Sequence, residues 1–416
     1  MLIISVLQPL SAQNRITLEQ CQQQARENYP MIKQYDLLSA SEQYTLANLA
    51  KIYLPQFSLN AQATYQSEVT KLPFDLAALG LPIDIKTMNK DQYKATIDIN
   101  QIIWDGGLSN ANKKTVKANT EAEKQQVEVT LYQIKDRINQ LFFGILAVNE
   151  QMEILNLLEA DLIANKEVMQ SMFNNGTITQ SDLDQIEVEL LNVKQNRIEQ
   201  EALKESYVKM LSLYIHKDIG TNTVFEKPKE ILYQDNNILR PEKNFYNSKR
   251  DALESQLNAI DAKNMPQIGL FAQGGYGRPG LNMLENKFNL FAIGGVKLTW
   301  NFGNLYTKKN ERRLIELNKS NIDIQEETFV FSTNLQLSQQ QTEVQKLKKQ
   351  LAKDDEVIML RSRVKKAVES KYKNGVYTIN DLIKDINAEN QARQKKSLRE
   401  ILYLQSIYNY QYIQGN

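Results

Sequence analysis

The chain repeats one order of motifs about two hundred residues apart, and this duplication constrains the fold more than any other feature. Each copy has a Pro-Gln pair, an alternating stretch, a tryptophan, a very long helical pattern and an Asn-Gly pair, with an aspartate six residues after that glycine. The shared positions are Pro55, Trp104, Gly176 and Asp182 in the first copy, and Pro266, Trp300, Gly375 and Asp381 in the second. A unit of this size is too long for a solenoid repeat.

Composition excludes several classes of protein. The 50 basic and 49 acidic residues balance, so the concentrated positive field needed to bind nucleic acid is missing. A single histidine, His216, and a single cysteine, Cys21, argue against most metal sites and exclude a disulfide within one chain. Cys21 lies in a helical context, where packing is a simpler role than nucleophilic attack. We therefore expect no enzyme and no cofactor.

Two features of the sequence bear on export and on membranes. No run of 18 apolar residues is evident, so we expect no transmembrane helix, and a membrane role would have to use a barrel of alternating strands. Residues 1–13 resemble the end of a signal peptide, with an apolar stretch, Pro9 and the sequence Ser11-Ala12-Gln13. They lack a basic segment, and a frayed apolar terminus is the alternative.

Four stretches alternate apolar with polar residues, which predicts four strands in two pairs. The first begins at Gln56 and lasts about eleven residues, the length of a tilted strand that crosses a bilayer. The others cover 92–104, 267–276 and 288–300, and a slip of phase near Gln101 indicates a bulge. Residues 68–91 connect the first pair as a loop. A water-soluble antiparallel sandwich shows the same alternation and is the alternative.

A very long helix is predicted after each strand pair. Residues 105–172 contain no proline, and at 1.5 Å per residue they would span roughly 100 Å. Their apolar residues step by four and three, which is the seam of a coiled coil. The seam consists of Val127, Leu131, Ile134, Ile138, Leu141, Ile145, Val148, Met152 and Leu155. Residues 304–372 form the second long helix, with a weaker seam.

Each long helix is expected to end at its Asn-Gly pair, because glycine accepts the positive φ that stops a helix. A returning helix then begins, capped by Thr179 or Ser181 in the first copy and by Thr378 or Asn380 in the second. The returning helices, 181–215 and 380–412, are about half as long as the outgoing ones. We infer that helices 18–51 and 242–264, which precede the strand pairs, supply the missing halves. The first of these helices is expected to kink or break at Tyr29-Pro30.

The order, spacing and duplication of these motifs resemble the TolC-like outer-membrane efflux proteins, and the resemblance covers residues 16–413. Its motifs are Gln-Ile-Ile-Trp-Asp-Gly-Gly before the first long helix and Phe-Asn-Asn-Gly with Asp-Leu at the first hairpin. The resemblance divides the chain into a first repeat, 17–216, a linker, 217–241, and a second repeat, 242–413. It implies a mixed fold in which a homotrimer closes a twelve-stranded membrane β-barrel that continues as a periplasmic α-helical barrel.

The function implied by the resemblance is a passive exit duct of a tripartite efflux or type I secretion system. The implied location is the outer membrane with a long periplasmic extension. The implied partners are outer-membrane lipid, a periplasmic adaptor and an inner-membrane transporter, which supplies the energy. A soluble periplasmic coiled-coil adaptor or scaffold is the alternative, although an adaptor has one α-hairpin and this chain has two in tandem. The transported substrate is left open.

The resemblance also nominates site residues at the periplasmic tips of the hairpins, which are marked by Gly176 and Gly375. In the family, the aspartate at position 381 points into the pore, and three copies would form a ring that favours cations. Asp182 is its counterpart in the first copy. The family often has a second aspartate where this chain has Lys384, which would partly neutralise the ring.

Tyr372 matches a position that links neighbouring hairpins in the family, whereas Tyr377 replaces the usual arginine and cannot form an ion pair. A simpler interpretation is that Asp182 and Asp381 cap the returning helices. Both roles can coexist.

Overall fold

The structure of the chain is a computed structural model, which describes residues 15–70, 88–220, 223–230 and 237–416. The predicted signal segment, 1–13, and most of the predicted loop, 68–91, lie outside the described residues. The chain divides into two compact units. We call residues up to Tyr35, 125–245 and 325–416 the hairpin unit, and residues 36–124 and 246–324 the sheet unit. Each unit takes segments from both halves of the chain, so the units are not the sequence repeats.

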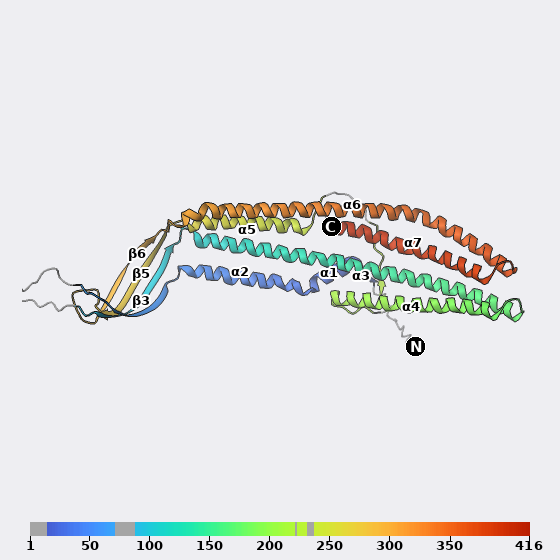
Figure 1. Cartoon of the computed structure of the whole chain (residues 1–416), viewed down its shortest axis with the longest axis horizontal. Coiled ribbons are helices and arrows are strands. Elements are labelled where there is room, and N and C mark those ends of the chain that lie inside the picture. Colours follow the sequence, from blue (N-terminus) through green and yellow to red (C-terminus); the bar gives the residue numbers. More distant parts are fainter. Residues whose placement is uncertain (1–14, 71–87, 221–222, 231–236) are drawn as a thin grey trace, which may run out of the picture. The chain divides into compact units, whose positions relative to one another are not determined.

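The sheet unit contains one four-stranded antiparallel sheet (Figure 1). Its strands are β2 (Gln56–Tyr65), β3 (Asp91–Trp104), β5 (Gln267–Arg278) and β6 (Asn289–Thr299), in the order β2-β3-β5-β6. The predicted strand pairs are confirmed, and the register of β3 against β5 shifts between Ile102 and Trp104, close to the predicted bulge. The β3–β5 pairing joins the first half of the chain to the second.

The two faces of this sheet differ in polarity. On one face, Asp98 accepts hydrogen bonds from Asn60 on β2 at 2.6 Å and from Gln273 on β5, so a polar ladder crosses three strands. Apolar side chains on the other face remain exposed in the single chain, as with Leu59 at 77% and Leu290 at 83%. Exposed apolar faces of this size indicate a further contact surface.

The helices follow the predicted order with small changes at their ends. α1 (Leu18–Asn28) begins with a capping box of Thr17 and Gln20, and the predicted break at Pro30 is a short 3-10 turn, η1 (Pro30–Lys33). The remaining helices are α2 (Gln34–Ala50), α3 (Leu108–Asn174), α4 (Gln180–Ile215), α5 (Pro241–Lys263), α6 (Asn304–Lys373) and α7 (Ile379–Gln414).

In the hairpin unit, the end of α4 contacts the end of α1, and the end of α7 contacts the residues that precede α5. At the first joint, His216 ends α4 with a φ of 53°, and the side chain of Asn28 donates to the carbonyl of Ile215 at 3.0 Å. At the second joint, Gly415 ends α7 with a φ of 107°, and the backbone N–H of Leu239 donates to the carbonyl of Gln414 at 2.7 Å.

The hairpin unit also contains a pairing that the sequence did not suggest. β1 (Arg15–Ile16) pairs in parallel with β4 (Val224–Phe225), which lies in the linker between the repeats. The ring of Phe225 packs edge-on against Phe142 of α3 at 5.6 Å between ring centroids. The β1–β4 pair, which we call the strap, therefore packs on the long helix α3.

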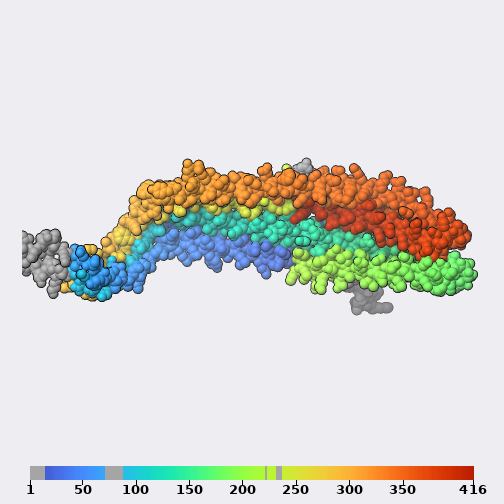
Figure 2. Space-filling model, in the orientation of Figure 1, coloured from blue at the N-terminus to red at the C-terminus, as the bar shows by residue number. Residues whose placement is uncertain are grey.

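One described helix, α3, contains an 18-residue stretch that is apolar enough to cross a membrane by length and composition. Buried core helices pass the same test of length and composition, so the expectation of no transmembrane helix stays a prediction. In this chain the apolar stretch is part of the core of the hairpin unit, where Ile138, Phe142 and Ile145 are fully buried. Figure 2 shows α3 between α4 and α7, and a helix covered on several sides must be apolar on several sides.

The turn between β3 and α3 generates a testable prediction. Gly106 and Gly107 both have positive φ, at 70° and 85°. A Cβ atom on Gly106 would lie 2.4 Å from the Cβ atom of Met265, whereas one on Gly107 would meet nothing within 4 Å. Gly107→Ala should lower the free energy of unfolding by about 1–2 kcal/mol, and Gly106→Ala by about 2–4 kcal/mol. Guanidinium denaturation followed by the fluorescence of nearby Trp104 measures both, and equal losses would contradict the steric argument.

Candidate functional site

The two hairpin tips have the same backbone geometry. In the first, the N–H of Gly176 donates to the carbonyl of Phe173 at 2.8 Å, and the N–H of Thr177 donates to that of Met172 at 3.0 Å. The second tip repeats this pattern around Gly375, and the two glycines have φ values of 73° and 71°. Both tips are therefore Schellman turns, in which glycine accepts the left-handed conformation at little cost.

The returning helices begin with matching capping boxes. Thr179 and Thr378 are the N-caps, and the carboxylates of Asp182 and Asp381 each accept from the cap's own N–H, at 2.8 and 3.0 Å. The hydroxyls of both threonines donate to the same oxygen, Oδ2. The capping interpretation of Asp182 and Asp381 is thus confirmed.

Capping leaves part of each carboxylate free. Within the described residues, the Oδ1 atom of Asp381 has no hydrogen-bond partner. The hydroxyl and the backbone N–H of Thr378, followed by the charge of Lys384, hold the pKa of Asp381 below its usual value, so it is ionised at neutral pH. Lys384, expected to partly neutralise this charge, forms no ion pair with Asp381, because the carboxylate is turned toward Thr378.

Tyr372 joins the two hairpins through burial. Its side chain belongs to a core that all four hairpin helices share, which we call the tip core. Burial, and then the negative charge of Asp182, raises the pKa of Tyr372, which places this tyrosine of α6 close to the start of α4. Its hydroxyl makes no hydrogen bond to the described residues. Nearby, the ammonium of Lys371 lies 5.0 Å from the ring centroid of Tyr377.

A charged cluster that sequence reasoning missed borders the tip core. The ammonium of Lys365 on α6 lies 2.7 Å from Asp161 of α3 and 3.1 Å from Glu389 of α7. Arg393 also pairs with Glu389, at 2.6 Å. Burial lowers the pKa of Lys365, but its bonds to Asp161 and Glu389 outweigh this and raise it overall. The cluster ties the first hairpin to the second.

A signal for this cluster was present but weak. Lys365 stands seven residues from Ile358 and from Tyr372, and Glu389 stands seven from Leu382. Both charges therefore occupy apolar seam positions of their helices. The partner Asp161 is 204 residues from Lys365, so no local pattern could have identified it.

The single cysteine and the single histidine of the chain, Cys21 and His216, lie outside the tips and have structural roles. Cys21 is completely buried in α1, and burial raises its pKa to about 12, so it is an unreactive thiol. His216 ends α4, as expected from the sequence. Among the described residues, no group of histidine, cysteine, aspartate and glutamate has the geometry to hold a metal ion.

The Lys365 cluster yields a prediction for stability. Lys365→Met should leave Glu389, which is 5% exposed, without one of its counter-ions. We expect the free energy of unfolding to fall by about 2–4 kcal/mol. The matched control is Lys366→Met, an exposed neighbour on the same helix, which should change it by less than about 0.5 kcal/mol. Adding Glu389→Gln to Lys365→Met should recover part of the loss in guanidinium denaturation, and a loss unchanged by this second substitution would contradict a charge effect.

Comparison with known proteins gives one family and a set of similar folds. The model of the outer membrane efflux protein family matches residues 21–210. No relative among the curated proteins matches the chain by sequence.

Solved structures match nearly the whole chain. VceC of Vibrio cholerae, an outer membrane protein, is 14% identical with a TM-score of 0.67, and the match covers 96% of each chain. The CmeC outer membrane channel of Campylobacter jejuni is 13% identical with a TM-score of 0.65, covering 96% of this chain and 85% of that one. The open-state MtrE channel of Neisseria gonorrhoeae is 13% identical with a TM-score of 0.66, covering 96% and 89%. At these identities, the structures establish a shared fold.

Proposed function

The chain belongs to the outer membrane efflux protein family, and on this premise we propose that three copies form a continuous exit duct through the outer membrane. The protein is an outer-membrane efflux channel with a long periplasmic helical extension. In the proposed assembly, the sheets of three copies close a twelve-stranded barrel, and the helices of three copies form a tube below it.

The observation that carries the proposal is the open four-stranded sheet. Its edges, β2 and β6, have strand partners on one side only among the described residues, while its strands are 10 to 14 residues long. In lipid, every backbone N–H and C=O must find a partner within the protein, so an open edge is not tolerated. Barrels need at least about eight strands, which one chain cannot supply and three chains can.

The proposed duct is passive. An inner-membrane transporter would supply the energy, and a periplasmic adaptor would dock on the exposed Schellman tips at Gly176 and Gly375. The tandem hairpins and the paired strands of membrane length favour a channel over the soluble adaptor that the sequence left as an alternative.

The first test is assembly. The purified protein in mild detergent should be a trimer by light scattering, and it should form conducting pores in planar lipid bilayers. A stable monomer without pore activity would overturn the proposal.

The second test concerns the tips. We propose that Asp381 both caps α7 and lines the narrow entrance of the duct, because its Oδ1 atom is free while Oδ2 caps. Asp381→Asn keeps a side-chain oxygen that can accept from the backbone N–H of Thr378 in the capping box, and it removes the charge. It should reduce cation preference, measured as the reversal potential of single channels in a salt gradient. Lys384→Ala should increase that preference.

The control for this test is Asp251→Asn, which removes the same charge from α5, in the sheet unit. It should leave the reversal potential unchanged, and the trimer should persist in all three variants because exposed charges contribute little to stability. Unchanged reversal potentials in both tip variants would restrict Asp381 to capping.

A further inference from the structure

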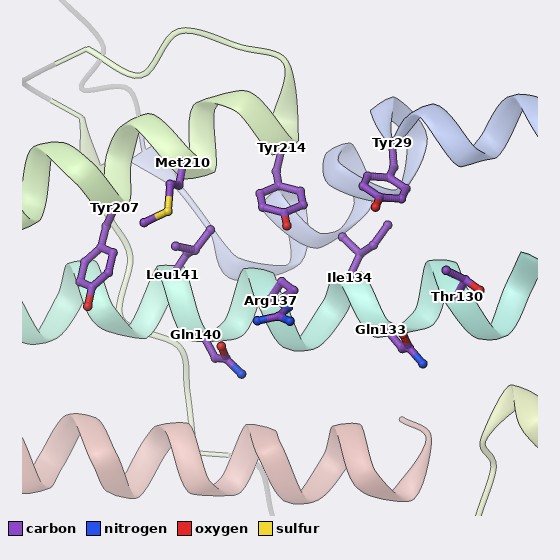
Figure 3. Close-up of a pocket in the computed structure, with 10 residues that line it drawn as sticks. All are labelled: Tyr29, Thr130, Gln133, Ile134, Arg137, Gln140, Leu141, Tyr207, Met210 and Tyr214. Atoms are coloured by element: carbon purple, nitrogen blue, oxygen red, sulfur yellow. The ribbon is translucent and has the colours of Figure 1, made fainter.

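The first helix joint leaves an open groove beside α3 (Figure 3). The groove encloses about 630 Å³ and lies entirely within the hairpin unit. This volume is in the range of pockets that hold small organic molecules. The groove is distinct from the hairpin tips and from the Lys365 cluster, and the proposed duct function leaves it unexplained.

Aromatic side chains form one wall of the groove. Tyr29, at the α1–η1 junction, and Tyr214, near the end of α4, have rings 6.4 Å apart and inclined by 15°. Tyr207 precedes Tyr214 on α4, and its ring packs on Gly144. A Cβ atom added to Gly144 would lie 2.9 Å from this ring. Met210 continues this wall. Such a wall suits a flat apolar ligand, because tyrosine rings offer large faces that stack.

The opposite wall is α3, where a polar stripe adjoins the apolar residues Ile134 and Leu141. Figure 3 shows Ile134 and Leu141 pointing toward the tyrosines, and Gln133 and Gln140 pointing away from them. Thr130, Gln133, Arg137 and Gln140 are spaced by three, four and three residues, so they share one face of the helix. Figure 3 shows Arg137 on the side of α3 that faces Tyr214. Arg137 lies on α3 between Ile134 and Leu141, so a cation adjoins the apolar part of the groove.

The guanidinium of Arg137 forms no close ion pair in the part of the chain that the structure describes. Burial raises the pKa of the adjacent Asp136, and the charge of Arg137 acts to lower it by a smaller amount. None of the residues that line the groove is acidic. The adjacent carboxylate, Asp136, accepts a hydrogen bond from Gln140 at 2.8 Å and forms no ion pair with Arg137. A guanidinium offers five N–H donors in a plane, which match a carboxylate or sulfonate.

At the second joint, an arginine is packed among aromatic rings and paired with a carboxylate. There, Arg240 lies over the rings of Tyr132, Phe329 and Tyr412 at 5.0 to 5.7 Å, and Glu242 neutralises it. Counting back equal distances from the helix ends, Tyr207, Met210 and Tyr214 correspond to Ser406, Asn409 and Ile413. The second copy therefore lacks aromatic residues at these three positions, and its arginine already has a partner.

We propose that the groove binds an amphipathic organic anion, with its flat apolar part against the tyrosines and its acidic group on Arg137. A second copy of the chain fits less well, because an apolar helix seam laid on the stripe would bury the guanidinium without a partner. If the proposed duct is correct, such an anion belongs to the class of solutes that pass through it, and this part of the inference rests on the proposed function.

The test uses the assembled protein in lipid nanodiscs and two dyes with the same ring system. Fluorescein is an anion and rhodamine 123 is a cation, and fluorescence anisotropy reports the binding of each. Fluorescein should bind more tightly than rhodamine 123. Arg137→Gln should weaken fluorescein roughly tenfold to a hundredfold, the effect of losing hydrogen bonds to a charged group. Tyr214→Ala should weaken it roughly two- to tenfold, while Tyr214→Phe, which keeps the ring, should not.

The matched control is Arg361→Gln, which removes an exposed arginine of α6 away from the groove and should leave fluorescein binding unchanged. Equal binding of the two dyes, or an equal effect of Arg137→Gln and Arg361→Gln, would overturn the proposal. The proposal would also be overturned if the wild-type protein bound neither dye and Arg137→Gln destabilised the trimer. Together, these two results would mean that a second copy of the chain fills the groove. Pore formation is measured on the same preparations. Pores without dye binding refute this inference alone, whereas the absence of pores refutes the duct.

Discussion

The hairpin unit depends on the burial of α3 on several sides at once. Three consecutive residues of this helix contact three different elements: Phe142 packs on the strap strand β4, Phe143 lies 5.6 Å from Tyr408 of α7, and Gly144 receives the ring of Tyr207 of α4. A helix with this many neighbours cannot confine its apolar residues to one narrow stripe. Its composition therefore resembles that of a membrane helix although it forms the core of the unit.

Duplication in the sequence does not produce two equivalent halves. Both copies end a returning helix at a left-handed residue, His216 or Gly415. The second joint is filled by Arg240 and its ring of aromatic side chains. The first joint is lined by tyrosines that border an open groove, and Arg137 forms no close ion pair among the described residues. A difference of a few side chains at matched positions thus turns a packed joint into a groove.

Local interactions shape each hairpin tip, whereas long-range interactions join the two hairpins. The Schellman turns and the capping boxes of Asp182 and Asp381 use residues within six positions of each other, so each tip forms by itself. The two hairpins are joined by the tip core and by Lys365, which bridges three helices. Charge at the tip can therefore be altered with little effect on the contacts that hold the hairpins together.

The sequence by itself determined the four strands, the long helices, the turns at Gly176 and Gly375 and the helix breaks at Pro30 and His216. These features follow from periodicity and from backbone preferences that act within a few residues. It also placed Asp381 and Asp182 where they cap. Only the tertiary structure decided that β3 pairs with β5, that the strap lies on Phe142, that Lys365 reaches Asp161 and that Tyr29 faces Tyr214. These contacts join residues that are distant in the chain, and one sequence carries no local signal for which distant partners will meet.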